Sequence, residues 1–146
     1  MITAKQLMNT GVITIHKDED IYEAMRMMAL NNITGLPVVD DDSTLVGVVT
    51  EKDILVLLCN HLDDASMDPA IGKVGEFMTR NVVCFEPEDN LSDIVECLST
   101  NQFRRVPILD RGKLVGIISR RDVIRYLRDL QQQDEVVKDS ILELLY

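Results

Sequence analysis

The chain has 146 residues, a hydrophobic content of 46% and a formal net charge of −10. Its longest apolar run, Ile54–Cys59, is far shorter than the roughly 20 residues that span a membrane. The acidity argues against a nucleic-acid surface, which needs a basic face. We therefore expect neither a membrane nor a nucleic-acid partner, and the start of the chain shows no apolar secretory signal.

Three cysteines without CxxC spacing predict neither a disulfide framework nor a zinc site. Cys84 falls in an expected strand and Cys97 in an expected helix, so buried thiols are the simplest interpretation. This suits a reducing compartment, and we expect a cytoplasmic location. His61 stands close to two aspartates, but an acidic linker explains that stretch better than a metal site, so no metal is expected.

The expected elements follow one another in the same order twice: helical turn, strand, helix, strand, strand, helix. The helices are amphipathic, with apolar residues three and four apart, and acidic residues precede the first long helix of each copy. In the first copy the elements lie at 4–8, 12–15, 21–29, 36–39 and 46–49, followed by a helix from Thr50. In the second copy they lie at 73–78, 82–85, 91–98, 106–109 and 115–118, followed by a helix from Ser119.

The end of each copy repeats one pattern. Val46–Asp53 recurs as Val115–Asp122, an apolar strand broken by glycine that runs into a hydroxyl residue, with an aspartate three positions later. Because each local pattern occurs twice in the same order, the sequence predicts two equivalent structural units. Helices mixed with short strands predict an α/β or α+β fold, and we expect a ligand to bind between the copies.

The repeat predicts the division of the chain. We expect one domain at 4–60, a linker rich in aspartate at 61–72, a second domain at 73–130 and a helical extension at 131–146. The extension has one apolar face. It either packs on its own subunit or mediates dimerisation or partner docking.

The hydroxyl–aspartate pairs have two interpretations. Thr50 and Ser119 would be helix N-caps, with Asp53 and Asp122 in the first turn. Alternatively, the free NH groups of a helix start bind phosphate, and an aspartate accepts hydrogen bonds from a ribose diol. Cations near both motifs favour an anionic ligand: Lys52, Arg104, Arg105, Arg120 and Arg121.

Over roughly residues 4–130, the doubled motif resembles a tandem pair of CBS (cystathionine-β-synthase-type) domains, the Bateman module. The resemblance implies two β-α-β-β-α units that pack through their sheets in pseudo-two-fold symmetry. It implies an adenosine ligand, AMP, ADP or ATP (with Mg²⁺ possible beside ATP) or S-adenosylmethionine, in one or both clefts between the units. It also implies a homodimer that regulates a separate protein.

The resemblance assigns residues of both copies to each cleft. The first cleft joins Thr50 and Asp53 to Val82, Val83, Arg104, Arg105, Val106 and Pro107. The second joins Ser119, Arg121 and Asp122 to Val12, Ile13, Thr34, Gly35, Leu36 and Pro37. Because the first cleft contains two arginines, we expect phosphate to bind better there, with Arg105 as the direct contact.

Two functions are compatible with these residues. The main hypothesis is a non-catalytic energy sensor that binds an adenosine nucleotide and signals to a partner. The alternative is a protein-interaction or dimerisation module in which the motifs only cap helices. We expect no enzyme, because the sequence offers no nucleophile paired with a base and only two scattered histidines.

Overall fold

The computed structural model describes residues 1–61, 71–132 and 142–144, with backbone only at His61. It has an α+β fold with two compact units and two small sheets. Ile13–Val82 form one unit, called here the continuous unit. Met1–Val12 and Val83–Tyr146 form the other, called the bipartite unit. Among the described helices, none is long and apolar enough to cross a membrane.

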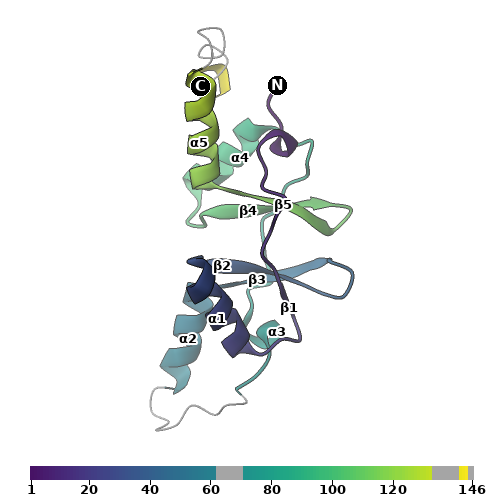
Figure 1. Ribbon diagram of the computed structural model, residues 1–146, viewed down its shortest axis with the longest axis vertical. Coiled ribbons are helices and arrows are strands. Elements are labelled where there is room, and N and C mark those ends of the chain that lie inside the picture. The colour runs from purple at the N-terminus through teal and green to yellow at the C-terminus, as the bar shows by residue number, and fades with distance from the viewer. Residues whose placement is uncertain (62–70, 133–141, 145–146) are drawn as a thin grey trace. The chain divides into compact units, whose positions relative to one another are not determined.

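The continuous unit packs helices against one face of a three-stranded sheet (Figure 1). The strand order is β1-β2-β3, with β1 parallel and β3 antiparallel to β2. Its elements are β1 (Ile15–His16), α1 (Ile21–Asn31), β2 (Gly35–Val39), β3 (Leu45–Thr50), α2 (Glu51–His61) and α3 (Val74–Phe77).

The bipartite unit repeats this plan with a two-stranded antiparallel sheet. Its helices α4 and α5 again lie on one face of the sheet (Figure 1). Its elements are the 3-10 turn η1 (Ala4–Gln6), α4 (Leu91–Thr100), β4 (Arg105–Asp110), β5 (Lys113–Ser119) and α5 (Arg120–Gln131).

Local chemistry fixes both ends of α1. The Asp20 carboxylate accepts a hydrogen bond from the Tyr22 backbone NH at 2.7 Å and so caps the first turn. Asn32 ends the helix in the left-handed conformation with φ 51°, which asparagine tolerates better than most residues. Between these ends, the helix buries the face that carries Ile21, Ala24 and Met28, as its spacing predicts.

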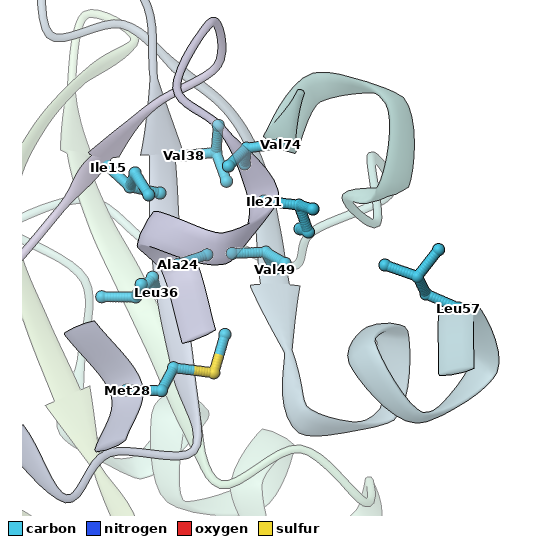
Figure 2. Packing of buried hydrophobic residues seen from close by; sticks show 9 residues of the cluster. All are labelled: Ile15, Ile21, Ala24, Met28, Leu36, Val38, Val49, Leu57 and Val74. Atoms are coloured by element: carbon cyan, nitrogen blue, oxygen red, sulfur yellow. The ribbon is translucent and has the colours of Figure 1, made fainter. Parts of the chain in front are cut away.

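Each unit has its own aliphatic core. In the continuous unit β2 is buried along its whole length, and the helices pack on one face of its sheet. Figure 2 shows this core, to which α3 contributes Val74. The core of the bipartite unit contains the following buried residues: Ala4, Leu91, Ile94, Leu98, Val106, Ile108, Ile118 and Val123.

The first strand of each copy is shorter than the sequence predicts. In place of a strand over 12–15 the structure has β1, Ile15–His16, and in place of one over 82–85 it has a single parallel bridge from Phe85 to Ile108. The proline of the neighbouring strand explains both cases. The Phe85 NH donates to the Pro107 carbonyl at 3.0 Å, on the edge where Pro107 has no NH to give in return.

The described units are not identical with the two sequence repeats. The turn at 4–8 belongs to the bipartite unit, where Met8 packs against Gly116. The turn at 74–78 belongs to the continuous unit, where Met78 packs against Gly47. The first turn of each copy therefore packs on the strands of the other copy.

Two predicted segments lie partly outside the described residues. The linker at 61–72 is described only at its ends, and residues 63 and 64, with the side chain of His61, are outside the description. Of the extension at 131–146, residues 131–132 and 142–144 are described. Leu144 packs against the core of the bipartite unit, which supports packing of this part on its own subunit.

Candidate functional site

The start of α2 holds the first hydroxyl–aspartate pair. Asp53 Oδ2 accepts hydrogen bonds from the Thr50 backbone NH at 2.9 Å and from the Thr50 hydroxyl at 3.0 Å. Asp53 Oδ1 accepts a third hydrogen bond, from the Thr79 hydroxyl at 3.0 Å. The carboxylate therefore ties the strand end, the helix start and the turn after α3 together.

The start of α5 holds the second pair in the same arrangement. Asp122 Oδ2 accepts from the Ser119 backbone NH at 2.9 Å, and the Ser119 hydroxyl accepts from the Asp122 NH at 3.1 Å. This is a reciprocal capping box, closed by aspartate in place of the commoner glutamate. Asp122 Oδ1 lies 3.7 Å from Arg125 Nη1. Both motifs thus cap their helices, as one of the two sequence interpretations predicts.

The residue opposite each hydroxyl differs between the units. The sheet register pairs Thr50 with Gly35 and pairs Ser119 with Arg105. An added side chain at Gly35 would meet the Thr50 methyl group and the Val49 carbonyl, both at 3.4 Å. The bipartite unit therefore has a guanidinium group where the continuous unit has no side chain.

Arg105 lies in an electrostatic environment suited to an anion. It is half-buried, and burial lowers the pKa of its guanidinium. The negative charge of Asp122 acts in the opposite direction, and the neighbouring charge of Arg104 again lowers the pKa. A desolvated cation gains more than a solvated one from an anionic partner, because screening by water is weaker.

The other cations of the motifs are distributed unevenly. Arg120 donates to the carbonyls of Leu98 at 3.2 Å and Asn101 at 2.7 Å, so it fastens α5 to the end of α4. Arg104 is exposed, and its carbonyl accepts from the Arg120 NH at 2.9 Å. Arg121 and Lys52 are exposed in the first turns of their helices.

The remaining predicted site residues fall into two groups. Leu36, Pro37, Val106 and Pro107 are buried, so their side chains serve the cores and only their backbones could serve a ligand. The others are exposed or half-buried: Thr34 before β2, and the residues where the chain passes from one unit to the other, Val12, Ile13, Val82 and Val83.

The structure brings the predicted residues together within each unit. Thr50 and Asp53 meet Thr34 and Gly35 in the continuous unit, where the Glu51 NH donates to the Thr34 carbonyl at 3.0 Å. In the bipartite unit, Ser119 and Asp122 share their surroundings with Arg105. The family resemblance instead assigns Arg105 to the cleft of Thr50 and Asp53. That grouping joins residues of different units and stays a prediction.

Sequence reasoning missed Thr79. The only signal was its position after Met78, which corresponds to Asn9 after Met8 in the first copy. Both residues follow a turn that packs on the other copy and pair there with the strand before the motif, Thr79 with Val48 and Asn9 with Ile117.

Within the described ranges, no three histidine, cysteine or acidic residues are grouped so that they could hold a metal. The His61 candidate lies outside these ranges. The described cysteines are free: Cys59 is exposed, while Cys84 and Cys97 are half-buried, and burial raises the pKa of both thiols.

These two similar α+β units, each with a capped helix after its last strand, define a tandem-repeat module. The sequence matches the CBS domain family twice, at residues 4–60 and 74–129, and the chain belongs to that family. Among curated relatives, this chain is 32% identical to the uncharacterised protein MJ1225 of Methanocaldococcus jannaschii. The match covers 84% of this chain but only 42% of that protein. It is 29% identical to hypoxic response protein 1 of Mycobacterium tuberculosis, covering 87% of this chain and 86% of that protein.

Solved structures show the same fold. CBSX2, solved in complex with AMP, has 31% identity and a TM-score of 0.79, over 90% of this chain and 99% of that chain. CBSX2 comes from Arabidopsis thaliana. The CBS domain pair of MJ0100, solved with 5′-methylthioadenosine and S-adenosylmethionine, has 27% identity and a TM-score of 0.72, over 88% of this chain and 98% of that chain.

Proposed function

We propose that the chain is a non-catalytic regulatory module that binds an adenosine nucleotide and transmits its binding state to a partner protein. The observation that carries the proposal is the cluster of Arg105, Ser119 and Asp122 at the start of α5. It combines a desolvated cation with a helix start and a carboxylate. Such a set recognises phosphate and a ribose diol.

The relatives support the ligand class. CBSX2 was solved with AMP, and the MJ0100 pair with two adenosine compounds that carry sulfur in place of phosphate. In this chain Arg104 and Arg105 repel the cationic sulfonium of S-adenosylmethionine and attract phosphate. AMP, ADP or ATP, the last with Mg²⁺ beside its phosphates, is therefore the proposed ligand ahead of S-adenosylmethionine.

The two motifs do not contribute equally. The cluster with Arg105 is the stronger phosphate site, because its counterpart at Gly35 offers no cation. The continuous unit contributes Thr50 and Asp53, for which the proposed partner is the ribose. The backbone and apolar residues that the resemblance adds to both sites stay part of the proposal.

Regulation requires that the nucleotide prefer one of two states of the module, since a ligand shifts an equilibrium only by its differential affinity. The partner protein reads that shift. A reducing cytoplasm, where these nucleotides are abundant and the free cysteines stay reduced, is the proposed setting.

A second candidate function has its own observation. Asp53 and Asp122 already make the capping hydrogen bonds that would account for the motif without any ligand. In that case the chain is an interaction or dimerisation module, and its function lies in contacts with other proteins.

A thermal-shift titration separates the two. The unfolding temperature would be followed with AMP, ADP, ATP and S-adenosylmethionine, with and without Mg²⁺. A ligand at about 100 times its Kd stabilises the folded protein by about 2.7 kcal/mol, which is several degrees for a chain of this size. We expect AMP to raise the unfolding temperature of the wild-type protein and to do so much less in Arg105→Gln.

The matched control is Arg26→Gln. Arg26 is an exposed arginine on α1 that pairs with Glu23, and it belongs to neither motif. It should keep the full AMP response. The AMP response of Asp53→Asn then tests whether the Asp53 carboxylate of the continuous unit binds the ribose. Absence of any nucleotide response in well-folded wild-type protein would refute the sensor and favour the interaction module.

A further inference from the structure

Thr79 contacts the Asp53 carboxylate from outside the hydroxyl–aspartate motif. Its hydroxyl donates to Asp53 Oδ1 at 3.0 Å, from a position 26 residues further along the chain. The two hydrogen bonds from Thr50 both reach the other carboxylate oxygen, Oδ2, at 2.9 and 3.0 Å. Thr79 therefore restrains the oxygen that the motif itself leaves unrestrained.

The backbone of Thr79 is held on β3 independently of its side chain. The Thr79 NH donates to the Val48 carbonyl at 2.8 Å, and the Val48 NH donates to the Thr79 carbonyl at 2.9 Å. Met78, one residue earlier, packs against Gly47 of the same strand. Because a threonine side chain is stiff at χ1, the hydrogen bond to Asp53 has little further motion to restrict.

The bipartite unit has the same backbone arrangement without this side-chain contact. Asn9 corresponds to Thr79 in the repeat, and it pairs with β5 as Thr79 pairs with β3. The Asn9 side-chain oxygen accepts from the Gly11 NH at 3.0 Å. Among the described residues, none donates a hydrogen bond to Asp122 Oδ1, and Arg125 Nη1 lies 3.7 Å from it. A unit of this fold therefore does not need the contact in order to place its turn.

The contact still allows Asp53 to accept a ribose hydroxyl. An ionised carboxylate has about four acceptor positions, two on each oxygen. Within the described part of the chain, the Thr50 donors fill those of Oδ2, and Thr79 fills one of those of Oδ1. Oδ1 can therefore accept one more hydrogen bond. A carboxylate that is already oriented loses less freedom on binding than one that the ligand must order.

We propose that Thr79 is a positioning residue, which holds Asp53 in the orientation that accepts a hydroxyl of the nucleotide ribose. The inference rests on the proposed function and adds that the two motifs are supported unequally. Asp53 is oriented on both oxygens before a nucleotide arrives, whereas the described bipartite unit orients Asp122 by hydrogen bonds at Oδ2 alone. Thr79 acts through Asp53 and makes no contact of its own with the ribose.

Titration calorimetry of the full chain with two probes, AMP and 2′,3′-dideoxy-AMP, tests this role. Thr79→Val replaces the hydroxyl by a methyl group and keeps the β-branched shape. It should raise the Kd for AMP about fivefold, as expected for one net hydrogen bond, and leave the Kd for dideoxy-AMP unchanged, because that probe has no ribose hydroxyl for Asp53. Thr79→Ser retains the hydroxyl and should restore most of the AMP affinity. Sites of different affinity are fitted separately, so an unaffected second site does not hide the change.

The matched control is Thr44→Val, the same change in the same unit. Thr44 lies in the turn before β3, at the opposite end of that strand from Thr50, and belongs to neither motif. Both Kd values should stay at the wild-type level. A double-mutant cycle adds a second readout: Asp53→Ala weakens AMP binding, and Thr79→Val in that background should weaken it no further, because the hydroxyl has lost its acceptor.

Three results would overturn the positioning role. Equal weakening of AMP and dideoxy-AMP by Thr79→Val would show that Thr79 only supports the local fold. Unchanged AMP affinity in Thr79→Val, beside a wild-type protein that binds AMP, would refute the inference and leave the nucleotide function standing. A folded wild-type protein that binds neither probe would refute the proposed function, and this inference with it. The two failures are therefore distinguishable by the wild-type titration alone.

Discussion

Gly47 and Gly116 show how single residues position the motifs. Each interrupts the strand that leads into a hydroxyl–aspartate pair, and each leaves space for a methionine. A side chain added at Gly47 would lie 2.7 Å from the Met78 sulfur and 2.7 Å from the Thr79 carbonyl. One added at Gly116 would lie 2.6 Å from the Met8 sulfur and 3.1 Å from its Cβ, with no backbone atom among these contacts.

The two glycines therefore tolerate substitution differently. Gly116→Ala displaces a flexible methionine, whereas Gly47→Ala must also move the Thr79 backbone, which exchanges hydrogen bonds with Val48 at 2.8 and 2.9 Å. We expect a loss of unfolding free energy of about 1 kcal/mol for Gly116→Ala and about 2–3 kcal/mol for Gly47→Ala, within the range for overpacking. Urea unfolding measures both. Equal losses would show that the Thr79 backbone yields as easily as a side chain.

At this scale the sequence predicts which residues belong to the candidate sites better than it predicts which of them lie together. The doubled motif identifies Thr50, Asp53, Ser119 and Asp122, because the same residue types recur at the same spacing. Thr79 escaped notice, since 26 residues separate it from Asp53. The influence of the Asp122 charge on Arg105 depends on the register of β4 against β5, which no local pattern reveals.

At the scale of elements, the helices follow the sequence closely and the first strands do not. Amphipathic spacing is a strong signal, and the buried faces of α1 and α4 are those that the spacing predicts. A short apolar run such as 82–85 carries no information about its partner. Its partner strand contains Pro107, and the missing NH leaves Phe85 with one bridge.

The N-caps of α1 and α4 differ although their positions are equivalent. The Asp20 carboxylate accepts from the Tyr22 NH, whereas the Asn90 side chain makes no capping hydrogen bond. Asp20→Ala should therefore cost about 1 kcal/mol of unfolding free energy, and Asn90→Ala only a few tenths. Chemical denaturation of the two variants beside the wild type tests this. A loss at Asn90 as large as that at Asp20 would contradict the assigned cap.

At the scale of the molecule, the exchange of turns between the repeats is the feature that sequence alone leaves open. Met8 and Met78 are equivalent in the two repeats, and so are Gly47 and Gly116. The sequence therefore does not say which methionine packs against which glycine. The structure pairs Met8 with Gly116 and Met78 with Gly47. Each compact unit consequently contains the first turn of one repeat and the remaining elements of the other.

This exchange predicts which fragment folds alone. A fragment of residues 13–82 keeps Val74, which is fully buried, and the pairing of Thr79 with Val48, so it retains the whole described core of the continuous unit. A fragment of residues 4–72 contains the complete first repeat but loses both. We expect dispersed amide resonances and a cooperative thermal transition from the first fragment, and neither from the second. Folding of both would mean that the turn at 4–8 can replace the turn at 74–78, so that chain connectivity, rather than side-chain fit, selects the exchanged pairing.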